Sequence, residues 1–118
     1  MIFADGFRVD VDVASTEAAR ARGLMFCDTL DEREGMLFVF DVPDCYGFWM
    51  NNVRVPLDII WLDARGRVVW IVERAAPCLS DPCPMYLPDA RASYVVEVIG
   101  GFVARHGLRV GDFVAVNW

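Results

Sequence analysis

The spacing of short strand-like segments constrains the fold of this chain most strongly. Residues 7–13 (FRVDVDV) alternate strictly between apolar and charged side chains, which is the pattern of a half-buried strand. Other apolar segments of strand length lie at residues 36–40, 46–50, 56–62, 67–73, 94–99 and 113–116. Most of these segments are joined by connections too short for a crossover, so most neighbouring strands are expected to pair antiparallel.

Two short helices fit between these strands. Ser15 or Thr16 can cap a helix that ends at Gly23, and residues 102–106 can form a second helix before Gly107. We therefore expect an α+β fold that is mostly β, with about seven mainly antiparallel strands in a small sandwich or a partly closed barrel. At this length, residues 1–118 are expected to form one domain.

The composition excludes several classes of function. The formal net charge is −6 and there is no basic stripe, so we expect neither a nucleic-acid partner nor an anionic membrane surface. The chain has no Lys, which excludes Schiff-base chemistry and a Lys general base. No apolar run reaches the roughly 18 residues that a membrane-spanning helix needs. No export signal is visible at the start, so the protein either stays inside the cell or begins after a removed leader.

The block FWMNN at residues 48–52, followed by PLD at residues 56–58, has the side chains of a binding site. Alternation along the strand would turn Trp49 away from its two apolar neighbours, so that Trp49 can line a pocket while they fill the core. Stacking against an aromatic ring, combined with a polar rim, suits a polar and ring-shaped ligand such as a sugar.

Amides and a carboxylate supply the polar rim. Asn51, Asn52 and Asp58 offer hydrogen-bond donors and acceptors in a small space, and Tyr86 can reach the same rim from the long Pro-rich loop at residues 75–92. The alternative is that Asn51 and Asn52 only form a turn and that Asp58 caps backbone N–H groups.

The same loop contains a pair of cysteines. Cys78 and Cys83 can form a structural disulfide, which is the natural interpretation for an exported protein. A redox-active pair, a zinc site completed by two further ligands, and two free thiols are the alternatives. Cys27 and Cys45 are expected to be free thiols. Nothing in the spacing of Cys, His or Met favours a metal, so we expect no metal and no cofactor.

Carboxylates leave one enzymatic alternative open. Asp58 could act with Asp81 or Glu97 as a glycoside hydrolase if two carboxyl groups lie roughly 5–10 Å apart. Against this, alternation in its strand would turn Glu97 to solvent. His106 is the only histidine and lies near the end of the second short helix, where a capping or surface position is expected.

Several motifs follow one another in a fixed order from about residue 7 to residue 116. They are ARGLMF at 21–26, EGMLFVF at 34–40, FWMNN at 48–52, PLD at 56–58, PC at 77–78, DPCPMY at 81–86 and GLRVGD at 107–112. Together they resemble the family catalogued as domain of unknown function 192. The resemblance implies a small single domain, often behind an export signal, with no generally established enzymatic activity. Asn51 stands where the family usually has Lys, so a charged contact at that position is not carried over to this chain.

We therefore predict a small extracytoplasmic binding domain, periplasmic or extracellular, with a cytoplasmic location as the alternative. A carboxylate-based hydrolase, or a structural or protein-interaction domain without a small-molecule site, are the alternative functions. The sequence assigns neither a reaction nor an oligomeric state. The predicted ligand is a small polar molecule such as a carbohydrate, bound by Trp49, Asn51, Asn52, Asp58 and Tyr86.

Overall fold

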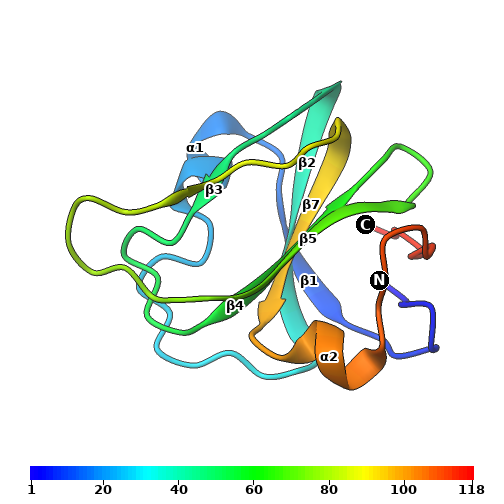
Figure 1. Ribbon diagram of the computed structural model, residues 1–118, viewed down its shortest axis with the longest axis horizontal. Coiled ribbons are helices and arrows are strands. Elements are labelled where there is room, and N and C mark those ends of the chain that lie inside the picture. The colour runs from blue at the N-terminus through cyan, green and yellow to red at the C-terminus, as the bar shows by residue number, and fades with distance from the viewer.

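A five-stranded sheet in the order β1-β2-β7-β4-β5 forms the body of the computed structural model, which describes residues 1–118 (Figure 1). A second sheet contains only β3 and β6. The strands are β1 (Asp10–Ala14), β2 (Glu34–Asp44), β3 (Phe48–Trp49), β4 (Leu57–Leu62), β5 (Val68–Ala75), β6 (Met85–Tyr86) and β7 (Ala92–Ile99), and the helices are α1 (Glu17–Arg22) and α2 (Phe102–His106).

All strand pairs are antiparallel except β1 with β2. The connection between these two parallel strands is long enough for a crossover, and it contains α1. Neither sheet closes into a barrel. The predicted α+β fold, mostly β with about seven mainly antiparallel strands and two short helices, is confirmed.

Local sequence signals explain α1. The Oγ1 atom of Thr16 accepts a hydrogen bond from the backbone N–H of Ala19 at 3.1 Å, which is the expected N-cap. Gly23 ends the helix with a φ of +48°, a value that a residue with a Cβ atom rarely adopts. Neither α1 nor α2 is long and apolar enough to cross a membrane.

The prediction of a last strand at residues 113–116 is wrong, because this segment forms only isolated bridges. Phe113 bridges to Arg67, whereas Ala115 bridges to Ile2. The segment is therefore divided between two different partners, the turn after β4 and the N-terminus, and it builds no continuous ladder with either of them.

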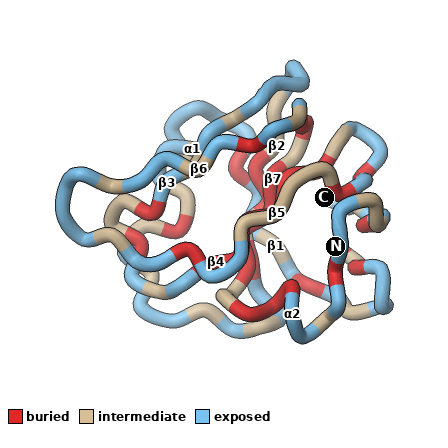
Figure 2. The backbone as a smooth tube through the Cα atoms, viewed as in Figure 1, coloured by how far each residue is buried: buried red, intermediate tan, exposed pale blue.

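Both faces of the central strand β7 are covered. On one face Val96 and Val98 pack with Phe102 of α2 and with the N-terminal residues. On the other face Val95 packs with Ile59 and Trp61 in a second cluster. Figure 2 shows the buried segments gathered along β2, β7 and β4. Side chains on either side of β7 therefore lie inside the protein.

Candidate functional site

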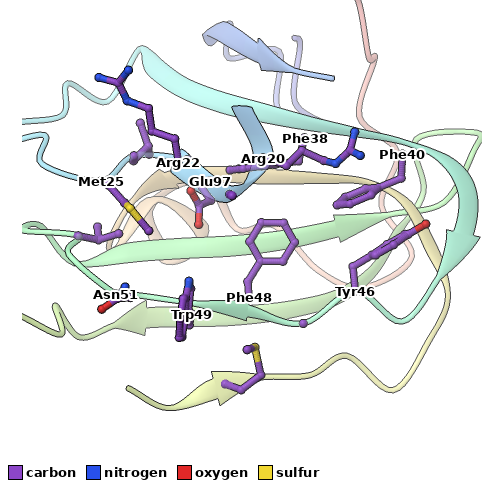
Figure 3. A pocket seen from close by; sticks show the side chains of 16 residues that line it. Arg20, Arg22, Met25, Phe38, Phe40, Tyr46, Phe48, Trp49, Asn51 and Glu97 are labelled. Carbon is purple, nitrogen blue, oxygen red and sulfur yellow. The ribbon is translucent and has the colours of Figure 1, made fainter. Parts of the chain in front are cut away.

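A cavity of about 240 Å³ lies on the second of these faces, between α1, β3 and β7 (Figure 3). Trp49 of β3 is 43% exposed and forms part of the rim. Five aromatic residues from β2, β3 and the segment between them line the cavity, and they are Phe38, Phe40, Tyr46, Phe48 and Trp49.

Contacts between rings fix the positions of this aromatic wall. Phe40 and Tyr46 are stacked with 3.6 Å between their ring centroids, and Phe48 meets the ring of Phe38 edge-on at 4.8 Å. Phe48 also lies edge-on to Trp61 in the core beneath. Such pairs stabilise beyond the area they bury, so the cavity wall is preformed.

Glu97 lies at the inner end of the cavity. It belongs to β7 and is only 3% exposed, and Figure 3 shows its carboxyl group pointing from the strand into the cavity. The Glu97 side chain makes no hydrogen bond and no ion pair with any other group of the protein. Burial raises the pKa of Glu97 to about 8, since a desolvated carboxylate is unfavourable.

The expectation that Glu97 faces solvent is therefore wrong. Alternation predicts solvent exposure only for a strand with one covered face, and β7 has both faces covered. A signal in the sequence was available, because Glu97 is the only charged residue in the otherwise apolar run of residues 94–99. A continuous apolar run indicates a strand buried on both faces, where a lone carboxyl is unusual.

Two arginines of α1 also line the cavity. The guanidinium group of Arg20 donates to the backbone carbonyl of Val39 at 2.9 Å and lies 5.0 Å from the ring centroid of Phe40. Arg22 is exposed and has no ion-pair partner. Neither guanidinium group pairs with Glu97, and Figure 3 shows both directed away from its carboxyl group.

The structure brings two of the five predicted ligand contacts to the cavity, Trp49 and Asn51. Asn52 instead occupies a turn with a φ of +59°, where its backbone N–H donates to the carbonyl of Cys78 at 2.9 Å. Tyr86 pairs with Phe48 across the β3–β6 ladder and does not line the cavity.

Asp58 lies away from the cavity and is fully buried. Its Oδ1 atom accepts hydrogen bonds from the backbone N–H groups of Arg74 at 2.8 Å and Gly101 at 3.1 Å. Its Oδ2 atom accepts a further bond from Val103 at 2.7 Å. These contacts hold the start of α2 and the end of β5 together, so the Asp58 carboxylate has a structural role.

The carboxylates of the hydrolase alternative do not meet. Asp58 lies opposite Val98 in the β4–β7 ladder, and Glu97 lies opposite Ile59, so the two acids project to opposite faces of the sheet. Asp81 is exposed in the loop between β5 and β6 and does not line the cavity.

The predicted disulfide between Cys78 and Cys83 is present. It closes a small ring beside the cavity, because Asn51 forms a bridge with Cys78 and the backbone N–H of Cys78 donates to the carbonyl of Met50. Cys27 and Cys45 are free thiols, as expected.

His106 lies on the other face of the sheet, at the end of α2. Its ring stands between the rings of Phe7 and Phe102, with centroid distances of 4.3 and 4.2 Å. Its Nδ1 atom lies 2.6 Å from a carboxylate oxygen of Asp5, and its Nε2 atom lies 3.0 Å from one of Glu32. The histidine therefore ties the N-terminal segment to α2 and is not part of the cavity.

Comparison with known proteins agrees with the motifs described above. The sequence model of the DUF192 family, described as Uncharacterized ACR, matches residues 1–116. No curated protein matches the chain.

Two solved structures are similar along nearly the whole chain. A protein of unknown function from Novosphingobium aromaticivorans DSM 12444 is 34% identical, with a TM-score of 0.88 over 98% of this chain and 81% of that chain. A protein from Sinorhizobium meliloti 1021, described as a "putative transcription regulator", is 31% identical, with a TM-score of 0.83 over 95% of this chain and 86% of that chain.

Proposed function

The chain belongs to the DUF192 family, and we propose that it binds a small polar ligand, such as a carbohydrate, in the cavity beneath α1. In this proposal Trp49 stacks against the ligand ring at the rim, and the amide of Asn51 hydrogen-bonds to it. The proposed site therefore has fewer of the residues predicted from the sequence, since Asn52, Asp58 and Tyr86 lie outside the cavity. We further propose that the protein works outside the cytoplasm.

The observation that supports binding best is the combination of a preformed aromatic wall with polar groups that the protein leaves unpaired. Ligand pockets are mostly apolar, with a few well-placed polar groups that orient the ligand. Here five aromatic rings surround the cavity, while the Glu97 carboxyl has no protein partner. No fully enclosed side-chain oxygen of the protein lacks a hydrogen bond, so the Glu97 oxygens keep slight contact with solvent through the cavity. A ligand that displaced this solvent and supplied the hydrogen bond would gain affinity.

The extracytoplasmic location is supported by the Cys78–Cys83 disulfide, because structural disulfides persist in oxidising compartments and are rare in the cytosol. Thiol counting on denatured protein, taken without reductant from the organism that makes it, tests this location. Two free thiols are expected, and four free thiols would contradict an oxidising compartment.

The other functions have less support. Carboxylate-based hydrolysis needs two acids near one another, whereas Asp58 and Glu97 face opposite sides of the sheet. Transcription regulation, the description given to the Sinorhizobium meliloti protein, would require contact with DNA or with other regulators. The net charge of −6 disfavours direct contact with the phosphate backbone.

Ligand binding can be tested with a panel of hexoses, hexosamines and N-acetylhexosamines, using tryptophan fluorescence and thermal shift. At least one class should quench fluorescence and raise the melting temperature of the wild-type protein. Trp49→Ala should abolish the quenching while circular dichroism shows a retained fold. Trp118→Ala is the matched control, since Trp118 is exposed and lies outside the cavity. Binding that is unchanged in Trp49→Ala, or no binding by any sugar, would sink the proposal.

A further inference from the structure

We propose that the ligand of this cavity bears a positively charged amino group, and that Glu97 is the residue that binds this ammonium group. The ligand class is therefore a small ring-shaped amine, such as an amino sugar. This inference rests on the proposed function, because it assumes that the cavity is a ligand site, and it specifies which group of the ligand lies at the inner end of the cavity.

The position of Glu97 is the first argument. A carboxyl group that is 3% exposed would normally have hydrogen-bond partners in the protein, because a polar group is costly to bury without them, whether or not it is charged. Asp58 shows the normal arrangement in this same protein, with three backbone N–H groups on its two oxygens. Glu97 has none, and its carboxyl points into the one space from which a partner could come.

The protein itself supplies no cation to Glu97. Arg20 is engaged by the carbonyl of Val39 and the ring of Phe40, and Arg22 is exposed on α1. No arginine nitrogen lies within 4.0 Å of Glu97, and desolvation is the only cause of its shifted pKa. The remaining titratable group of the cavity wall, the phenol of Tyr46, donates to the carbonyl of Val42.

The aromatic wall is the second argument. A cation near the face of an aromatic ring is attracted by the negative charge of that face. Five aromatic residues line the cavity, and Glu97 is the only acid that lines it. The ring of Phe40 is already engaged by Tyr46 and Arg20, so the other rings are the ones that can attract a ligand cation. The two arginines lie on the α1 side, where they would repel a cation, so the ammonium group is directed toward Glu97 and away from α1.

The proton balance of binding follows from the burial of Glu97. At neutral pH the free protein holds a proton on Glu97, because its pKa is raised to about 8. When an ammonium ion binds, that proton leaves to solvent and the carboxylate forms an ion pair with the ligand. Below the pKa of Glu97, binding therefore releases about one proton, and affinity rises about tenfold for each pH unit.

The test compares each hexosamine, namely glucosamine, galactosamine and mannosamine, with its parent hexose and its N-acetyl derivative, by isothermal titration calorimetry. At least one amino sugar should bind at least tenfold more tightly than both neutral analogues at pH 6.5. Its affinity should increase about tenfold between pH 5.5 and 6.5. Titrations in two buffers of different protonation enthalpy should show the release of about one proton.

Glu97→Gln removes the carboxylate but keeps the size of the side chain. This variant should bind the amino sugar no more tightly than the parent hexose, and it should lose the pH dependence. Glu73→Gln is the matched control, because Glu73 is exposed on β5 and lies outside the cavity, and it should behave as wild type.

Two outcomes would overturn the inference, and they are distinguishable. Equal binding of amino and neutral sugars, unaffected by Glu97→Gln, would remove the ammonium but leave the proposed sugar site in place. Absence of binding by every sugar of the panel would remove both the inference and the proposed function.

Discussion

Asp58 and Glu97 lie on the neighbouring strands β4 and β7 and project to opposite faces of the same sheet. Both carboxyl groups are buried, but Asp58 accepts three backbone hydrogen bonds and Glu97 accepts none. The first acid therefore stabilises the fold, whereas the second one is available to a ligand. Their difference leads to two of the following predictions.

The Glu97→Gln variant should be more stable than the wild-type protein, by a difference in unfolding free energy that increases with pH. The folded protein keeps the Glu97 proton up to a pKa of about 8, whereas the unfolded chain releases it near the ordinary value of 4.5. Between these values the folded state binds more protons, so wild-type stability falls with pH by about 1.4 kcal/mol per unit because of this group. The difference in unfolding free energy between Glu97→Gln and wild type should grow from pH 5 to pH 8.

Urea denaturation at pH 5, 6.5 and 8 measures this difference, with Glu73→Gln as the exposed control. A difference that stays constant over this range would show that Glu97 titrates normally in the folded protein.

Replacing Asp58 by Ala should destabilise the protein strongly. The change leaves the buried N–H groups of Gly101 and Val103 without their acceptor and loosens the start of α2. Hydrogen bonds to a charged group contribute about 1.5–3 kcal/mol each, so a loss of about 3 kcal/mol or more is expected in chemical denaturation. Asp89→Ala, at an exposed position, should have little effect. Equal stability of the two variants would contradict the structural role of Asp58.

Removing the Cys78–Cys83 disulfide should cost about 2 kcal/mol of stability, from the entropy of closing a short loop. The double variant Cys78→Ser with Cys83→Ser tests this by urea denaturation, and Cys45→Ser is the control because Cys45 is an exposed free thiol. Addition of reductant should shift the midpoint of the wild-type protein but not that of the double variant. A reductant effect on both proteins would point to a different cause.

Replacing His106 by Gln should raise the pKa of two carboxyl groups. The backbone N–H of Phe7, and next the His106 ring, lower the pKa of Asp5. Arg105, and next His106, lower the pKa of Glu32. Both values should therefore move part of the way toward normal in the variant, as measured by NMR titration of the carboxyl carbons.

The sign of the pH effect follows from these lowered values. The ionised carboxylates of Asp5 and Glu32 stabilise the folded state above the pKa of the unfolded chain, and this stabilisation is lost as pH falls through the folded pKa. His106→Gln should accordingly make the acid side of the stability curve flatter. An unchanged acid limb would mean that the histidine contacts do not form in solution.

The sequence predicted the elements whose determinants are local. Thr16 and Gly23 mark the two ends of α1 because capping depends only on residues within one turn. Six of the seven strands, and the antiparallel pairing of most of them, also followed from short apolar segments and short connections. The seventh strand, β6, lies in the Pro-rich segment that was expected to be a loop. The disulfide between Cys78 and Cys83 could be predicted because the two residues share one loop.

Features that depend on distant contacts were not predicted, although the apolar run around Glu97 contained a local signal of its burial. The burial of Glu97 follows from layers on both sides of β7, and these layers come from segments far away in the sequence. The bonds from Asp58 to Gly101 and Val103 also join residues more than 40 positions apart. Trp49 and Asn51 line the cavity as the sequence suggested, but the opposite wall comes from α1 and β2. The position of that wall depends on the order of the strands in the sheet, which was not predicted from the sequence.

The cavity is shared between two parts of the protein that contribute differently to folding. Glu97 projects from the centre of the sheet, whereas the wall on the α1 side comes from a six-residue helix with no buried residue. Because α1 contributes so little to the core, its side chains can change without disturbing the sheet. Related proteins could therefore diverge in ligand preference through residues such as Arg20 and Arg22 while their strands keep the same carboxyl in place.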